Sequence, residues 1–262
     1  MSEKKVKKIH NFWNERAKEH KTSYLATVPD KFLKELEIKN ILKYIPKKKI
    51  KVVDIGCGNG FSTIAFAKER QADFLGVDYS ENMIEQAQKI LLQRKKKIKG
   101  KVRFISGNIL NLNFLSPATH DIVSTDRCLI NLVSLSDQKK AIKEISRVLK
   151  KGGKYIMCED TKEGLRKLNE LRILAGLEAI PNHWHNLYLN EKELLPYIER
   201  YFKIIKIDNF SSLYYIASRI FNAVSAIDIK TPNYLSVINK TATKLPSIGD
   251  YSPLKIFYLE KK

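Results

Sequence analysis

Three glycines at alternate positions, Gly56, Gly58 and Gly60, follow the short apolar stretch 50–55, which contains Asp54. Glycine lets the backbone bend sharply and approach a ligand within hydrogen-bond distance, because it has no Cβ atom. A helix that begins directly after such a loop adds free backbone N–H groups at the same place. The dinucleotide-binding fingerprint G-x-G-x-x-G has a different spacing. The loop therefore predicts a nucleotide-like ligand without a pyrophosphate.

Two charged residues, Asp126 and Arg127, follow the apolar stretch 121–124. Charged side chains at the end of a buried strand must be paired with another charge or must face a pocket. An ion pair of Arg127 with Glu159 or Asp160, at the end of the neighbouring predicted strand, is one interpretation. We favour the other, in which Arg127 faces the pocket and takes part in the chemistry of the site.

His183 and His185 flank Trp184 in a segment without regular periodicity. An ordinary imidazole pKa of about 6.5 makes histidine the natural base at neutral pH. His185 is therefore the candidate general base, and His183 is a candidate contact to the acceptor. The alternative is a capping loop in which Trp184 packs and both histidines face solvent. Because no acidic cluster accompanies the pair, we predict no metal site.

Tyr215 and Arg219 lie four residues apart, on one face of the helix expected at 213–226. A guanidinium beside a phenol suits an anionic, phosphate-bearing or sugar ligand. Packing of the tyrosine, together with a surface ion pair of the arginine, is the alternative. The sequence leaves both interpretations open.

Alternating apolar and amphipathic segments between residues 31 and 160 must position these side chains. Regular alternation of strands and helices implies a parallel sheet with helices on both faces. The expected strands are 50–55, 74–78, 102–105, 121–124 and 154–159, and the expected helices are 31–45, 61–70, 81–95 and 137–149, the last stopping at Lys151-Gly152-Gly153. Further on we expect helices at 162–175, 191–201 and 213–226, strands at 202–207 and 255–259, and no regular element in 227–253, which holds Pro232, Pro246 and Pro253.

The composition is that of an ordinary globular protein, with 44% hydrophobic and 29% charged residues in a chain of 262. No apolar run approaches the roughly 20 residues that a bilayer-spanning helix needs. The charged N-terminal segment has no apolar stretch after it, which argues against a secretory signal. Cys57, Cys128 and Cys158 have neither zinc-site nor disulfide spacing. We therefore expect a reduced, cytoplasmic protein.

The net charge of +20 comes mostly from short lysine clusters at 47–49, 95–97 and 150–151. A nucleic-acid surface is one interpretation of such a charge. We favour a solvated lysine-rich surface, because the clusters fall at predicted helix ends and turns, where lysine complements the helix dipole.

The stretch 52–60 (VVDIGCGNG) resembles the first motif of class I S-adenosylmethionine (SAM)-dependent methyltransferases. The stretches 76–80 (GVDYS), 106–109 (SGNI) and 151–153 (KGG) match later positions of that family in the same order. Asn108 departs from the aspartate that the family often has. The resemblance covers about residues 40–160. It implies a Rossmann-like α/β fold with a seven-stranded, mostly parallel sheet, an N-terminal helical cap and C-terminal helical insertions. It also implies the cofactor SAM and one domain, divided into a cap (1–45), a cofactor core (46–160) and substrate-side insertions carrying the last two strands (161–262).

The same resemblance implies roles for individual residues. Asp54 and the loop backbone would serve the methionyl end of the cofactor, Asp78 the ribose, Tyr79 and Met83 the faces of the adenine, and Asn108 and Ile109 its edge; core packing is the alternative for Met83. Trp13 and Arg16 belong to a segment that folds over the cofactor in small-molecule class I enzymes, and Tyr24 or Thr27 could reach the acceptor. The expected cofactor contacts are Trp13, Arg16, Asp54, Gly56, Cys57, Gly58, Asp78, Tyr79, Met83, Asn108, Ile109 and Asp126, and the expected acceptor contacts are Tyr24, Thr27, Arg127, His183, His185, Tyr215 and Arg219.

The acceptor is less well defined by the sequence. The Asn/Asp-Pro-Pro-Tyr/Phe motif of enzymes that methylate base nitrogens is absent after residue 124, and Cys128 lacks the preceding proline of cytosine C5 enzymes. The stretches 127–132, 158–161 and 184–188 resemble bacterial methyltransferases of capsular polysaccharide biosynthesis, which implies an activated sugar or a phosphoramidate-type precursor. The leading hypothesis is therefore an O-methyltransferase for a small polar, anionic acceptor. An RNA methyltransferase that uses the basic surface and a non-catalytic cofactor-binding protein are the alternatives.

Overall fold

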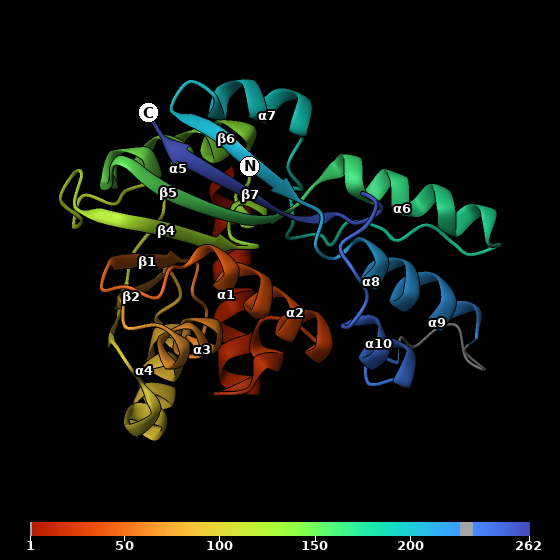
Figure 1. Ribbon diagram of the computed structural model, residues 1–262, viewed down its shortest axis with the longest axis horizontal. Coiled ribbons are helices and arrows are strands. Elements are labelled where there is room, and N and C mark those ends of the chain that lie inside the picture. Colours follow the sequence, from red (N-terminus) through yellow and green to blue (C-terminus); the bar gives the residue numbers. More distant parts are fainter. Residues whose placement is uncertain (1, 226–232) are drawn as a thin grey trace.

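A seven-stranded sheet forms the centre of the protein in the computed structural model, which describes residues 2–225 and 233–262 (Figure 1). The strands are β1 (Lys51–Ile55), β2 (Asp73–Asp78), β3 (Lys101–Ser106), β4 (His120–Asp126), β5 (Leu149–Asp160), β6 (Phe202–Asp208) and β7 (Leu254–Lys261). Their order is β3-β2-β1-β4-β5-β7-β6. The pairs that include β7 are antiparallel, and the other pairs among these strands are parallel. The predicted mostly parallel, Rossmann-like sheet is confirmed.

Successive side chains of a strand point to opposite faces of the sheet. Neighbouring residues of each central strand therefore pack into two separate hydrophobic cores, one on each face. Val53 contributes to the core under α5 (Leu135–Val148) and α7 (Glu191–Ile198). Val52 contributes to the core on the other face, under α2 (Lys31–Ile41) and α3 (Phe61–Glu69). The helix α4 (Glu81–Arg94) packs beside α3 on this second face. The sheet is therefore covered on both sides, as the alternation of elements predicts.

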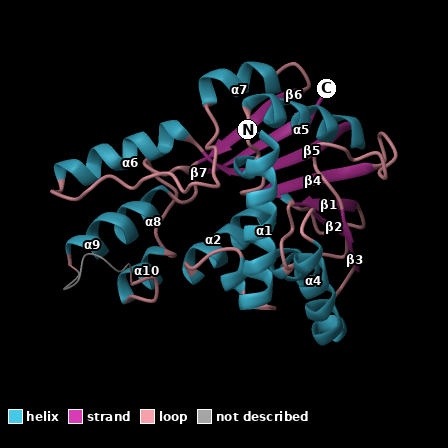
Figure 2. Ribbon diagram, turned by 180° about the vertical axis from the view of Figure 1, so that it is seen from behind, coloured by secondary structure: helices cyan, strands magenta, loops and turns pink. Residues whose placement is uncertain are grey.

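The remaining helices gather beyond the carboxyl ends of the parallel strands. The C-terminal lobe consists of α6 (Lys162–Leu174), α8 (Ser212–Ile216), the π-helical turn η5 (Ala217–Phe221), α9 (Asn222–Val224) and α10 (Val237–Ala242). It projects to the right of the sheet in Figure 1. The long N-terminal helix α1 (Ser2–His20) lies between this lobe and the central strands, as Figure 2 shows from behind. No helix among the described residues is long and apolar enough to cross a membrane.

Three local expectations are corrected by the structure. The helix expected to stop at 151–153 ends at Val148, and the glycines lie within β5. Leu149 pairs with His120 and Lys154 with Ile122, so the glycine-containing segment bulges out of the ladder between these pairs. The helix expected at 213–226 is divided by the π-helical turn, and residue 226 lies outside the described residues. The segment expected to be irregular contains α10, capped by the Ser236 side chain; Pro232 also lies outside the described residues.

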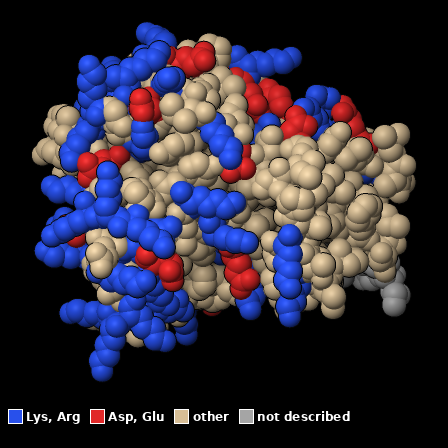
Figure 3. All heavy atoms as spheres, viewed as in Figure 1, with Lys and Arg blue, Asp and Glu red and all other residues tan. Residues whose placement is uncertain are grey.

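The basic clusters share one edge of the sheet. Lysines 47–49 precede β1, lysines 95–97 precede β3, and lysines 150 and 151 lie at the start of β5. Because parallel strands begin at the same edge, the clusters gather at the edge opposite the carboxyl ends. Figure 3 shows the corresponding concentration of Lys and Arg on the left of the molecule, away from the C-terminal lobe.

Candidate active site

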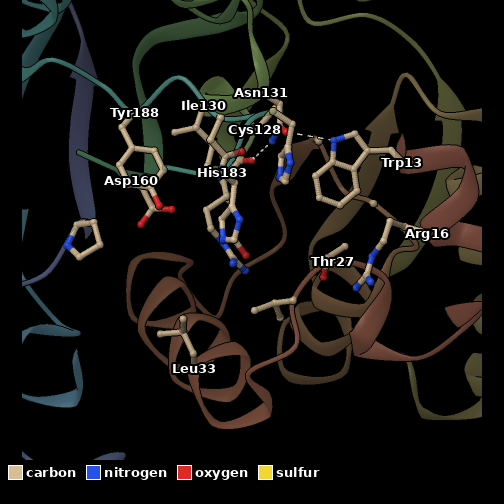
Figure 4. Close-up of a pocket in the computed structure, with 18 of the residues that line it drawn as sticks. Trp13, Arg16, Thr27, Leu33, Cys128, Ile130, Asn131, Asp160, His183 and Tyr188 are labelled. Atoms are coloured by element: carbon tan, nitrogen blue, oxygen red, sulfur yellow. Dashed lines mark hydrogen bonds and ion pairs between the residues drawn. The ribbon is translucent and has the colours of Figure 1, made fainter. Parts of the chain in front are cut away.

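A cavity of about 720 Å³ lies at the carboxyl edge of the sheet, enclosed by α1, α2 and the C-terminal lobe. We call its two sides the cofactor half and the acceptor half. The cofactor half is lined by Trp13, Arg16, Asp54, Gly56, Gly58, Asp78, Tyr79, Met83, Asn108 and Ile109, and the acceptor half by Arg127, Asp160, Tyr188, Tyr215, Ser218 and Arg219. Figure 4 shows Trp13, Arg16 and Thr27 on one side of the cavity and Asp160 and Tyr188 on the opposite side.

The glycine loop forms the floor of the cofactor half. Gly56 and Gly58 have φ values of +74° and +53°, a left-handed conformation that favours glycine. A Cβ atom on Gly56 would lie 2.6 Å from the Cys128 side chain, and one on Gly58 would lie 2.7 Å from the Thr27 methyl group. Both positions therefore require glycine for conformation and for space, and the loop backbone borders the cavity.

Two buried carboxylates hold this loop in place. Asp78 accepts hydrogen bonds from the backbone N–H of Gly58 at 2.8 Å and of Ser80 at 2.9 Å. Asp54 accepts from the hydroxyls of Thr63 and Ser124. Burial raises the pKa of both carboxyls to about 6, against the opposing effect of these donors. Both are mainly ionised at neutral pH, and each oxygen of both carboxylates has a protein donor.

The helix α1 covers the cofactor half from above. The Trp13 indole N–H donates to Asn131 Oδ1 at 3.1 Å, and the Arg16 guanidinium donates to the carbonyl of Leu25. Met83 lines the cavity and also packs in a small core with Trp13 and two alanines, so its two interpretations are compatible. The Asn108 Oδ1 accepts from the Leu110 N–H at 2.9 Å, which leaves its amide N–H groups to the cavity.

His185 lies in an aromatic cluster at the edge of the cap. Its ring stacks on Phe12 at 4.6 Å and lies edge-on to Trp13 at 5.7 Å between ring centroids. Burial, together with His183 and Arg16, lowers the pKa of His185 to about 4. The imidazole is therefore neutral over the physiological range and is a weak base. His183 and Trp184 are exposed at the cavity mouth.

Arg127 belongs to a buried network of four charges. Its guanidinium pairs with Glu37 at 2.9 Å, and Lys34 bridges Glu37 at 2.6 Å and Asp126 at 2.7 Å. The partner of Arg127 is thus Glu37 on α2, and the expected ion pair with Glu159 or Asp160 does not form. Arg127 also lines the cavity with φ of +52°, a strained conformation for a residue with a side chain. It is both paired and cavity-facing.

Glu159 has a different structural role from its neighbour Asp160. Its carboxylate accepts from the backbone N–H groups of Cys128, Leu129 and Ile130 at 3.0–3.3 Å, and so anchors the loop after β4. Burial raises the pKa of Glu159 to about 8, against these donors. Asp160 faces the cavity instead. The alternation of side chains along a strand separates the two carboxylates.

The C-terminal lobe is fastened to α2 through Asp30. The Asp30 carboxylate caps α2, accepts from the Tyr214 hydroxyl at 2.7 Å and pairs with Arg219 at 2.8 Å. The Arg219 guanidinium lies 5.2 Å from the centroid of the Tyr215 ring, and among the described residues its Nη1 atom has no hydrogen-bond partner. Arg219 and Tyr215 both line the cavity. They pack against each other, and Arg219 forms an ion pair with Asp30, as one interpretation expected. Both are also placed to contact a ligand, as the other interpretation expected.

The structure brings together every predicted site residue except Tyr24, whose ring lies against Phe61 instead of lining the cavity. Thr27 lines the cavity beside Gly58, and Cys57 and Asp126 also border it. Sequence reasoning missed Lys34, Glu37, Asp160, Tyr188 and Ser218. The first two carried a signal, because they are charged residues at helical spacing on the apolar face of 31–41.

The comparisons with known proteins agree with this geometry. A family model described as a methyltransferase domain matches residues 46–200. An uncharacterized methyltransferase of Schizosaccharomyces pombe is 34% identical over 124 residues, covering 46% of this chain and 42% of that protein. The demethylmenaquinone methyltransferase of Lactiplantibacillus plantarum is 36% identical over 110 residues, covering 41% and 44%. The chain thus matches less than half the length of both relatives.

A solved structure extends the likeness to most of the chain. Geranyl diphosphate C-methyltransferase from Streptomyces coelicolor, solved with S-adenosyl-L-homocysteine (SAH), superposes with a TM-score of 0.59 at 14% identity, covering 88% of this chain and 79% of that one. The chain therefore belongs to the methyltransferase-domain family. The family confirms the predicted methyltransferase domain, because its model matches more than half of the chain. The superposed structure confirms the predicted fold.

The residues present fit SAM on structural grounds. A glycine floor that a Cβ atom would fill lies beside two anchored carboxylates, under a cap of Trp13 and Arg16. The ionised Asp78 has acceptor capacity left for a hydroxyl after its two backbone donors. The apolar surfaces of Met83 and Ile109 suit the faces and the edge of a purine.

Proposed function

We propose that the protein transfers a methyl group from SAM to a hydroxyl group of a small polar acceptor. One observation carries this proposal: a single cavity joins the glycine floor to a second half that is lined by buried charged and phenolic side chains. When bound, SAM supplies an electrophilic methyl group on its sulfonium. The cofactor half would hold it through Asp54, the loop backbone and Asp78, and the C-terminal lobe would enclose the acceptor.

The residues of this chain would act mainly by positioning and by excluding water. The cap formed by α1 and the loop carrying His183 and His185 narrows the opening of the cavity. Alignment of the acceptor with the methyl group is the principal demand of an in-line displacement. We propose that the chain acts as one methyltransferase domain, with cap 1–45, cofactor core 46–160 and acceptor-side insertions 161–262. A cytoplasmic location remains a prediction.

For the acceptor we retain the proposal of a small anionic molecule. Arg219 supports it, since it lines the acceptor half and its Nη1 has no hydrogen-bond partner among the described residues. Arg127 adds a second guanidinium to the lining, although its Nε lies 3.7 Å from Asp126 Oδ1. An activated sugar or a phosphoramidate-type capsule precursor remains a hypothesis from sequence resemblance. The demethylmenaquinone methyltransferase among the relatives favours a small molecule in general and says nothing about a sugar.

RNA is the alternative acceptor, favoured by the net charge of +20. The position of the lysine clusters weakens it, because they lie at the amino-terminal edge of the sheet, opposite the cavity. A polyanion bound there would be held away from the methyl donor. RNA methylation predicts binding that weakens steeply with salt. Salt-independent or absent RNA binding would exclude this alternative.

The test is methyl transfer from SAM carrying a labelled methyl group. The purified protein is incubated, with and without nuclease, with a deproteinised extract that retains both RNA and small molecules. The extract comes from a gene-deletion strain of the organism that makes the protein. We expect nuclease-insensitive label in a small molecule, together with SAH binding by calorimetry. Label in RNA would support the alternative, and SAH binding without any transfer would support a non-catalytic protein. Absence of SAH binding contradicts the proposal outright.

A further inference from the structure

The acceptor half contains a buried carboxylate that has no hydrogen-bond partner among residues 2–225 and 233–262. Six aspartates line the cavity, and five have hydrogen-bond or ion-pair partners: Asp30, Asp54, Asp78, Asp126 and Asp137. Asp160 is 4% exposed, and among the described residues its carboxylate receives no hydrogen bond. A buried carboxylate is normally paired or hydrogen-bonded. Asp160 therefore stands out as a group whose partner is a ligand.

Nearby cations leave Asp160 free. Arg127 is committed to Glu37, and Arg219 is committed to Asp30. Both are close enough to lower the pKa of Asp160 without pairing with it, and Asp126, Tyr188 and Tyr215 are also near enough to interact electrostatically with it. The carboxylate is thus surrounded by charged and phenolic groups that are already engaged or are not donating to it. An incoming hydroxyl group is the donor that it lacks.

The place of Asp160 in the sheet suits a reaction with the donor methyl group. β5 lies two strands from β1, or about 10 Å, because neighbouring strands are about 4.8 Å apart. Asp160 ends β5, whereas the glycine loop follows β1, and the two face the same cavity. Figure 4 shows Asp160 across the cavity from Trp13 and Arg16. The span between them accommodates a small acceptor.

We propose that Asp160 is the general base that removes the proton from the acceptor hydroxyl, an inference that rests on the proposed O-methyl transfer. The hydroxyl oxygen forms a bond to the methyl carbon, and the bond from that carbon to sulfur breaks and leaves its electron pair on sulfur. The O–H bond breaks, and its proton moves to the Asp160 carboxylate. Charge and atoms balance without a further reactant.

The protonation state of Asp160 agrees with this role. Burial raises the pKa of Asp160 to about 6, against the opposing effect of Arg127, so the group is ionised at neutral pH and still accepts a proton. His185, the base expected from the sequence, has a pKa of about 4, which makes it the weaker base. The two groups also have different surroundings, since His185 lies within the aromatic cap.

The test compares the full-length protein with Asp160→Asn, which keeps the shape and removes the ionisable group. The probe is the extract described above with labelled SAM, assayed between pH 5 and pH 9. For the parent protein we expect a rate that rises with pH to a plateau near pH 7. For Asp160→Asn we expect a loss of about 100-fold or more and no such rise, with unchanged SAH affinity. Asp250→Asn is the matched control, because Asp250 pairs with Lys167 outside the cavity.

The possible outcomes separate this inference from the proposed function. Transfer by Asp160→Asn at the parent rate and with the parent pH profile overturns the role of Asp160 and leaves O-methyl transfer standing. No transfer by the parent protein contradicts the proposed function itself. As a second measurement, carbon-13 NMR of labelled aspartates in the SAH-saturated protein reports the ionisation of Asp160, assigned by its loss in Asp160→Asn. A midpoint near pH 6 is expected, and one below pH 4 overturns the proposal.

Discussion

The two halves of the cavity differ in how their buried polar groups are satisfied. In the cofactor half, both oxygens of Asp54 and of Asp78 accept hydrogen bonds from the protein. In the acceptor half, Asp160 Oδ1, Ser218 Oγ and Arg219 Nη1 are buried without a hydrogen-bond partner among the described residues. A buried polar group without a partner costs free energy. The cofactor half is therefore assembled before any ligand arrives, whereas the acceptor half is completed by its ligand.

This difference suggests that affinity for the cofactor and specificity for the acceptor arise in different halves of the cavity. A rigid glycine floor with anchored carboxylates suits a ligand that is the same in every catalytic cycle. Unpartnered donors and acceptors discriminate strongly, because a wrong ligand leaves them unpaired. The substitutions below test the contrast from its largest expected effect to its smallest.

Asp78→Ala removes the acceptor for two backbone donors of the cofactor half. Because Gly58 and Ser80 lose this anchor and the ribose loses its expected partner, we expect SAH affinity to fall about 100-fold or more. Calorimetry measures the affinity, and Asp78→Asn, which keeps one oxygen, is expected to lose less. Parental affinity in Asp78→Ala would show that the cofactor half does not depend on this anchor.

Asp160→Asn is expected to stabilise the fold while it impairs the reaction. The pKa of this carboxyl is about 6 in the folded protein and about 3.9 when unfolded, so its ionised form is disfavoured by folding. This cost is absent below pH 3.9, grows between pH 4 and pH 6, and is complete above that. At pH 8 we expect the variant to gain about 3 kcal/mol in the free energy of unfolding, and less at pH 5. Urea unfolding at both pH values measures the difference.

The control for that gain is Asp250→Asn. The hydrogen bond from Lys167 lowers the pKa of Asp250. Removal of the Asp250 carboxylate is therefore expected to lower the free energy of unfolding slightly, by about 0.5 kcal/mol at most. A loss of stability in Asp160→Asn at pH 8 would mean that the Asp160 carboxylate is stabilised by the fold. In that case the two halves of the cavity would not differ in the way described above.

Arg219→Lys tests the free guanidinium nitrogen of the acceptor half. Lysine keeps a positive charge beside Asp30 but cannot supply a second planar N–H group, so we expect the apparent acceptor KM to rise about tenfold. SAH affinity should stay unchanged. A dilution series of the extract measures the KM. Tyr214→Phe is the control, because it removes a hydrogen bond to Asp30 but lies outside the cavity lining. An equal rise of KM in Tyr214→Phe would assign the effect to the Asp30 anchor.

His185→Asn is expected to have the smallest effect. The imidazole is neutral above about pH 5, because its pKa is about 4, so the pH profile of methyl transfer between pH 5 and pH 9 should not change. Lost stacking on Phe12 should weaken SAH binding about threefold. Transfer assays and calorimetry measure both quantities. A variant that binds SAH normally but transfers no methyl group would make His185 the base in place of Asp160.

The features that the sequence could predict are those encoded locally. The glycine spacing at 56–60 and the strand that precedes it specify a left-handed turn and a parallel sheet within a few residues. The pairing of Arg127 is different, because it depends on Glu37, ninety residues earlier in the chain. The isolation of Asp160 is harder still to foresee. It follows from where Arg127 and Arg219 find their partners, which are Glu37 on α2 and Asp30 at the N-cap of α2.

Glu159 and Asp160 are neighbours on β5, yet one anchors a loop and the other faces the cavity. These two roles depend on the two-residue period of a strand. A substitution in β5 should therefore affect one side chain, whereas a change in the length of β5 should move both carboxylates. A one-residue insertion or deletion within the segment paired with β4 and β7 would exchange the faces of the two carboxylates. The loop after β4 would lose its anchor at the same moment that the cavity lost its base. Homologues that keep both functions should therefore vary in the length of the bulged segment 150–153 and keep a constant spacing from residue 154 to residue 160.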